Sequence, residues 1–218
     1  MKHLVLIFLA FSMSVLSFSQ DKIEEAVLTS KQSLTSDNEQ MNAQLAMVGD
    51  MTATVYVKGE NSRSELSSPM TGDVVTIIDG SQKKMLMLVD NPMSGKIYSL
   101  QSFDESSSKK MDLSVTKGNE TKTILGYECQ LYNVTYKLQG QEVKMEMYVT
   151  DAIEAANQEM ADFGDKIEGF PLFMKINMNQ MGANMTIINE VTKIEEKSVP
   201  KEKFDMTIPE GYKEIPQQ

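Results

Sequence analysis

Cys129 is the only cysteine in the chain and therefore its one candidate thiol nucleophile. A catalytic thiol is usually activated by a neighbouring base, most often a histidine. The single histidine, His3, lies in an N-terminal segment that we predict below to be removed. Nearby Tyr127 and Leu131 supply no base. We therefore predict that Cys129 is a small buried hydrophobic residue, and one cysteine excludes an internal disulfide.

The remaining residue types also argue against catalysis. A mature chain without histidine excludes Ser-His-Asp triads and histidine zinc sites. No phosphate-binding glycine loop and no dinucleotide fingerprint is found. Two carboxylates would suffice for a glycosidase, but the pairs Asp104–Glu105 and Glu195–Glu196 lie in polar stretches typical of solvated surface. The sequence thus predicts a protein that is not an enzyme and that uses no cofactor and no metal ion.

Methionine is abundant, with 18 residues, and several recur at alternate positions. Thioethers are soft ligands that suit copper(I), although the histidine that usually accompanies them in such sites is absent. Thioethers also fill ordinary cores and form adaptable apolar surfaces. Copper(I) binding, core packing and an apolar ligand surface are therefore three open hypotheses. The candidate groups are Met85/Met87, Met145/Met147 and Met178/Met181/Met185.

The N-terminus has the composition of a secretory signal peptide. Lys2 precedes an apolar run from Leu4 to Leu16, and Ser17-Phe18-Ser19 forms a small-x-small cleavage pattern before Gln20. The run is shorter than the roughly 20 residues that span a membrane, and no cysteine follows it for lipid attachment. We predict that residues 1–19 are removed near Ser19/Gln20 and that the protein is periplasmic or secreted, with no transmembrane segment.

Length and charge limit the remaining function classes. A chain of 218 residues suits one domain, here residues 20–218, with an N-terminal strand and connection over 20–50 and an antiparallel half-barrel over 51–218. The net charge of −10 and the pI near 4.7 argue against a nucleic-acid partner and against anionic lipid surfaces.

A period of two dominates from Met51 onward and predicts strands. Ala53, Val55 and Val57 alternate with polar residues. Further on, a turn at Gly126 is followed by a strand, a hairpin turn at Gly140 and a second strand that ends at Thr150. Such signals recur about every 8–12 residues, which is typical of a meandering sheet of nine to eleven strands. Outside that hairpin, the predicted strands are Ala26–Leu34, 51–58, 62–66, 74–78, 84–89, 97–100, Leu172–Met178, Met185–Ile194 and a short strand near Phe204–Ile208.

One helix is predicted directly after the hairpin. Asp151 and Glu154 form an Asp version of the capping box, and apolar residues recur at helical spacing up to Phe163, before Gly164. Glu39–Val48 is predicted to be either a short helix or a mobile connection. Residues 101–122 are rich in Ser, Lys and Asp and are predicted to be an exposed loop with a possible short strand at Leu113–Thr116.

The fold class expected from these elements is mainly β (α+β), a curved antiparallel sheet or half-barrel covered by one or two helices. Methionines at alternate strand positions share one face, and a curved sheet turns that face inward. The predicted lining of a ligand cavity is Met85, Met87, Met145, Met147, Met174, Met178 and Met185.

Several strings resemble one family. These are Thr123-Ile124-Leu125-Gly126-Tyr127-Glu128-Cys129, Met147-Tyr148-Val149-Thr150-Asp151, Gly169-Phe170-Pro171-Leu172 and the segment from Phe204 to Tyr212. They are similar to the DUF4412 family of secreted bacterial proteins over roughly residues 50–215. The Ser17-Phe18-Ser19-Gln20 junction resembles signal sites of Bacteroidetes, where the family is frequent.

The resemblance implies a lipoprotein-carrier-like fold, in which an incompletely closed sheet encloses an apolar cavity. It implies no established activity. The implied ligand is an acyl chain, a lipid or a lipidated partner protein. The alternatives are a structural or interaction protein of the cell envelope without a small ligand and, less favoured, the copper(I) binder.

Overall fold

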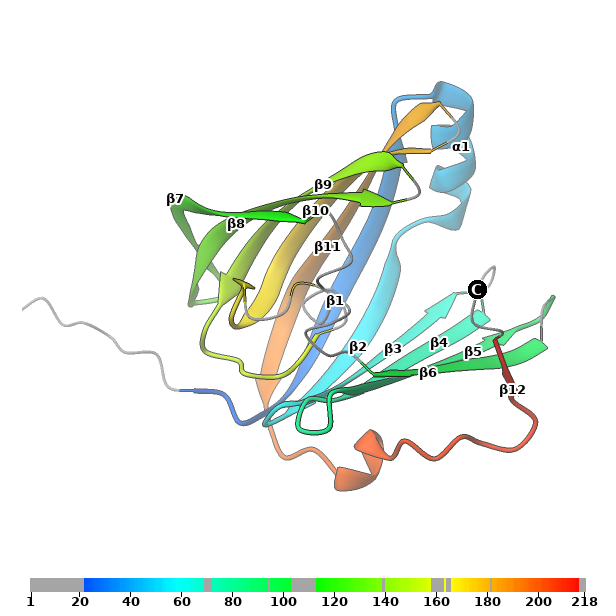
Figure 1. Cartoon of the computed structure of the whole chain (residues 1–218), viewed down its shortest axis with the longest axis vertical. Coiled ribbons are helices and arrows are strands. Elements are labelled where there is room, and N and C mark those ends of the chain that lie inside the picture. Colours follow the sequence, from blue (N-terminus) through cyan, green and yellow to red (C-terminus); the bar gives the residue numbers. More distant parts are fainter. Residues whose placement is uncertain are drawn as a thin grey trace, which may run out of the picture.

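A single curved sheet of 12 strands forms the protein in the computed structural model (Figure 1). The structure describes residues 22–68, 72–93, 95–102, 113–138, 140–157, 163, 166–180 and 182–215. The predicted signal peptide and Met181 lie outside these residues. The prediction of a mainly β, curved antiparallel sheet is confirmed.

The element bounds follow the chain in order. The strands are β1 Glu25–Ser36, β2 Met51–Lys58, β3 Asn61–Ser68, β4 Gly72–Asp79, β5 Lys84–Asn91, β6 Gly95–Ser102, β7 Ser114–Ile124, β8 Tyr127–Leu138, β9 Gln141–Thr150, β10 Phe170–Gln180, β11 Ala183–Glu196 and β12 Lys213–Glu214. The helices among the described residues are α1 Glu39–Val48 and the 3-10 helix η2 Lys201–Phe204.

Two antiparallel meanders, β2–β6 and β7–β11, make up the sheet, and β1 joins them. Spatial order runs β12-β6-β5-β4-β3-β2-β1-β11-β10-β9-β8-β7, so β1 pairs with β2 on one side and with β11 on the other. The two-residue strand β12 adds in parallel to β6. The strong bend brings the two meanders toward each other across a concave face (Figure 1).

The outer face of β4–β6 is covered by the end of the chain. Residues 201–215 run along the outside of these strands, drawn in red in Figure 1. Met206, Ile208 and Tyr212 pack there against a small core of Ile77, Leu86 and Leu88. Each buried apolar side chain in such a core contributes roughly 1.5–3 kcal/mol, so this segment is an integral part of the fold.

The helix predicted over Asp151–Phe163 is wrong in its described part. Residues 151–157 are irregular, with one isolated bridge between Ile153 and Ile23. The backbone N–H of Ala156 donates to Glu60 O at 3.0 Å instead of to a carbonyl four residues earlier. Glu154 does not cap a helix but forms an ion pair with Lys22 at 2.7 Å. Tertiary pairing thus overrides a local helical pattern.

A long edge strand replaces much of the loop predicted for residues 101–122. β7 covers Ser114–Ile124 and pairs with β8, while residues 103–112 lie outside the described part. The prediction failed because β7 is mostly exposed on both faces and so carries polar residues throughout. Lysines and a bulge between Lys117 and Thr121 are the usual protection of an exposed edge.

Two further predictions, for Glu39–Val48 and for the strand near Phe204–Ile208, have opposite outcomes. Glu39–Val48 is a helix, capped by Asn38, whose Oδ1 accepts from Met41 N at 3.0 Å. The strand predicted near Phe204–Ile208 is wrong, because Asp205 Oδ1 accepts from Thr207 N at 2.9 Å and bends the chain there. The last strand instead occurs at Lys213–Glu214.

Candidate functional site

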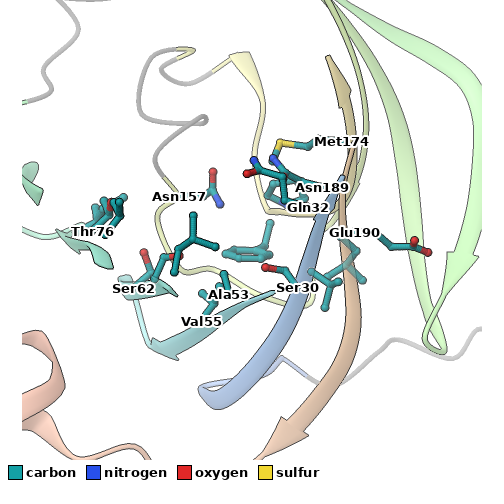
Figure 2. Close-up of a pocket in the computed structure, with 18 residues that line it drawn as sticks. Ser30, Gln32, Ala53, Val55, Ser62, Thr76, Asn157, Met174, Asn189 and Glu190 are labelled. Carbon is teal, nitrogen blue, oxygen red and sulfur yellow. The ribbon is translucent and has the colours of Figure 1, made fainter. Parts of the chain in front are cut away.

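A cavity of about 200 Å³ lies on the concave face of the sheet (Figure 2). Strands β1–β4 form one wall, β10 and β11 form the other, and Asn157 belongs to the segment that follows β9. Ten apolar residues line it: Ala53, Val55, Leu66, Val74, Ile78, Phe170, Pro171, Leu172, Met174 and Val191. Eight polar or charged residues complete the lining: Ser30, Gln32, Ser62, Ser64, Thr76, Asn157, Asn189 and Glu190.

Strand register explains why these residues meet. Residues opposite each other in an antiparallel pair point to the same face. Gln32 lies opposite Asn189, and Asn189 lies opposite Met174 on the next strand. On the other side, Ser64 lies opposite both Val55 and Thr76. These are two separate rows, because Gln32 lies opposite Met51 on β2 whereas Val55 lies opposite Leu28 on β1. Both rows face the concave side and contribute to the cavity floor.

The segment after β9 crosses the concave side and closes one end of the cavity. It is held to the β2–β3 turn by the Ala156 N–H, which donates to Glu60 O. The Ser62 hydroxyl donates to Ala156 O, so this lining residue already has its partner within the protein. Asn157 follows directly and lines the cavity.

The part of the concave face under β8–β10 is filled. Phe163 and Ile167, from the connection between β9 and β10, pack against Met145, Met147 and Met174 in one buried cluster. The Phe163 ring also lies 6.4 Å from that of Tyr136, centroid to centroid. Connecting residues thus occupy this half, and the cavity lies in the other half.

The seven methionines proposed from the sequence fall into different environments on that face. Met174 lines the cavity. Met85 and Met87 are half-buried on β5, opposite the cavity residues Ile78 and Thr76, and so extend its wall. Met145 and Met147 belong to the filled cluster, and Met178 packs against that cluster. Met185 is buried opposite Met178.

The cavity is electrically neutral toward a ligand. Glu190 is the one charged residue among the described lining residues, and it lies opposite Lys31 and Phe173. Its carboxylate points away from the labelled cavity side chains in Figure 2. Among the described lining residues there is no lysine or arginine. An anionic ligand would therefore find no counter-charge among the lining side chains.

The polar residues of the site were not predicted from the sequence. Gln32, Ser64 and Asn189 interrupt the apolar alternation of their strands at inward positions. That interruption was the available signal, since polar groups at inward positions need a partner. The sequence alone could not show that three such positions on three strands converge.

Cys129 is fully buried, as predicted, and makes no disulfide. Burial raises the pKa of its thiol to about 11, which keeps the thiol protonated at neutral pH. The Sγ–H lies 3.5 Å from Tyr127 O. A protonated, inaccessible thiol is a poor nucleophile, so the prediction of a structural role is supported.

Metal-ligating clusters and membrane-spanning helices are both absent from the described part of the chain. Within it, no group of three or more His, Cys, Asp or Glu side chains is arranged to hold a metal ion. Over the same residues, no helix is both long and apolar enough to cross a bilayer.

Comparison with protein families identifies the chain. The model of a domain of unknown function, DUF4412, matches residues 39–164, which is more than half of the sequence. The chain belongs to the DUF4412 family. The family assignment expected from the sequence is confirmed. The matched DUF4412 span contains α1 and β2–β9, whereas the cavity wall formed by β1, β10 and β11 lies outside it.

Solved structures show what this DUF4412 fold is similar to. PNGF-II matches with a TM-score of 0.53 at 10% identity, over 88% of this chain and 31% of that chain. The chain thus spans less than a third of that protein, and the likeness concerns the fold alone. The Mycobacterium tuberculosis lipoprotein LppX matches at 10% identity over 80% of this chain and 88% of that chain, but its TM-score of 0.31 carries no argument. No curated protein matches the sequence.

Proposed function

We propose that this DUF4412 protein is an exported, non-catalytic binding protein that holds an acyl group in the cavity on the concave face of its sheet. The acyl group could belong to a free lipid or to a lipidated partner protein, because both present the same hydrocarbon chemistry. The observation that carries the proposal is the cavity itself, with ten apolar lining residues.

The size of the cavity suits part of a ligand. An engineered apolar cavity of roughly 150 Å³ is large enough for benzene. A cavity of about 200 Å³ would therefore hold a polar head and a few methylenes, and not a complete diacyl lipid. Each buried methylene contributes about 0.8 kcal/mol.

The part of the acyl chain that does not fit in the cavity can contact an apolar surface beside it. Half-buried Met85, Met87 and Val89 continue the wall from β4 onto β5. Met adapts to many packings through its three rotatable bonds. In this proposal, the methionine side chains on the concave face contact the acyl chain beyond the cavity, and copper(I) is not the ligand.

Export supports the same function. The N-terminal segment of the sequence has the pattern of a signal peptide, and an extracytoplasmic location gives access to envelope lipids and lipoproteins.

The test is direct. Protein purified from the envelope fraction should carry extractable lipid by native mass spectrometry, and it should enhance the fluorescence of N-phenylnaphthylamine, an uncharged dye. Ala53→Phe fills the cavity and should weaken dye binding at least about tenfold. Thr52→Phe, one residue away on the opposite face of β2, is the matched control and should leave binding unchanged.

The opposite result has a clear meaning. A lipid-free protein that does not take up the dye would favour the alternative of an envelope interaction protein without a small ligand. The filled half of the concave face is the feature that agrees with that alternative.

A further inference from the structure

Two side-chain amides lie side by side on the cavity floor. Gln32 on β1 and Asn189 on β11 are directly opposed in the strand register, and both line the cavity (Figure 2). An amide side chain offers one acceptor oxygen and two N–H donors. In contrast to Ser62, which donates to Ala156 O, neither amide hydrogen-bonds with another described residue.

Hydroxyl groups line other parts of the cavity. Ser30 is two residues before Gln32 on the same strand, while Ser64 and Thr76 are paired across β3 and β4. These hydroxyls likewise have no hydrogen-bond partner among the described side chains and backbone groups. These amide and hydroxyl groups therefore present both donors and acceptors to the cavity, and all of them are neutral.

The neutrality of these amide and hydroxyl groups determines which ligands they can bind. A carboxylate or phosphate brought into this cavity would lose water without meeting a cation, and burying an unpaired charge is far more costly than burying a hydrogen-bonded neutral group. The net charge of −10 adds unfavourable potential for an anion. A neutral hydroxyl, ester or amide also loses its hydrogen bonds to water on entering the cavity, but it can replace them with hydrogen bonds to Gln32 and Asn189.

We infer that the cavity selects an uncharged amphiphile, whose hydroxyl, ester or amide head binds Gln32 and Asn189, over a free fatty acid. This inference rests on the proposed function and names the class of its ligand. An acylglycerol and the ester-linked acyl group of a lipoprotein both supply that neutral head chemistry.

Two ligands with the same acyl chain test the selection. Monolauroylglycerol and laurate compete for bound N-phenylnaphthylamine at about pH 8, where laurate is ionised, and both are kept below their micelle concentrations. The neutral ligand should displace the dye at a concentration at least about tenfold lower.

Two variants identify the residues responsible. Gln32→Met combined with Asn189→Leu keeps the volume and removes the amides, so it should abolish the preference while dye binding persists. Gln32→Lys introduces a cation and should shift the preference toward laurate by about tenfold or more. Gln44→Lys, on the exposed surface of α1, is the matched control for net charge and should change nothing.

Each outcome is distinct. Equal displacement by both ligands, or a preference for laurate, would overturn the selection and leave acyl binding intact. Displacement by neither ligand, together with no dye uptake, would remove the proposed function as well. Because the ligand comparison on the unaltered protein is decisive alone, the test survives a variant that fails to fold.

Discussion

Replacing Phe163 by alanine tests whether the connection between β9 and β10 is part of the core. The side chain is only 3% exposed and belongs to the cluster that contains Met145, Met147 and Ile167. Truncating a buried phenylalanine typically costs about 3–5 kcal/mol, through lost burial and the cavity that remains. For a domain of this size, each kcal/mol lowers Tm by about 2–4 °C, so the expected decrease is about 6–20 °C.

Urea denaturation monitored by tyrosine fluorescence and circular dichroism would measure the loss. The midpoint should fall while the slope with denaturant stays constant, which shows that stability and not the unfolded state has changed. Phe163→Met nearly conserves volume and should cost less than about 1.5 kcal/mol. Met93→Ala, at a site that is 93% exposed, should stay within about 0.5 kcal/mol.

The result that would refute this reasoning is also specific. A Phe163→Ala loss below about 0.5 kcal/mol, equal to the Met93→Ala control, would mean that the connection detaches without cost. The filled half of the concave face would then be an accessible surface, and the description of a separate cavity would have to be replaced.

Four further predictions follow from other parts of the molecule. N-terminal mass analysis of the exported protein should find Gln20 first, and retention of residues 1–19 would contradict the secretory assignment. Cys129→Ala should destabilise by about 1–2 kcal/mol, and the native thiol should label far more slowly than in urea, because it is buried with a raised pKa. Lys58 at 2.6 Å and the N–H of Val199 lower the pKa of Glu25 from 4.5 to about 2, so its contribution to stability is present above about pH 4.5 and is lost as the pH falls toward 2. Glu25→Gln should therefore lower the urea midpoint of unfolding at neutral pH, and the midpoints of the variant and the unaltered protein should converge in acid. A constant difference between the two midpoints across this pH range would contradict that linkage. Gly72→Ala should cost more than about 1 kcal/mol because Gly72 has a φ of 77° and an added Cβ would collide with Asp90 O, whereas Gly95→Ala, with open space at a φ of 79°, should cost less.

Period-two alternation predicted most of the sheet because most of the strands bury one face and expose the other. Val143, Met145 and Met147 alternate with charged or aromatic residues, and β9 is found where that pattern predicted it. Alternation did not predict the structure of segments that lack one buried and one exposed face. β7 is exposed on both faces, and the segment around Ile153 has adjacent buried residues, so neither carries a period of two.

The candidate site could be predicted only in part for a related reason. Apolar positions such as Met174 follow from the alternation of a single strand. Convergence of Gln32 with Asn189 depends on pairing between β1 and β11, which are separated by nearly the whole chain. A local pattern contains no information about that register.

The same long-range pairing has a consequence for folding kinetics. Ala26 pairs with Glu196, and β1 supplies the only strand contacts that join the two meanders among the described elements. Each meander consists of hairpins that can form locally, but closing the loop between β1 and β11 costs entropy before any contact offsets it. We therefore expect pairing of β1 with β11, which brings the two cavity walls together, to be the slowest step of folding. Before β11 is available for pairing, the chain can form two partial sheets but not the complete cavity.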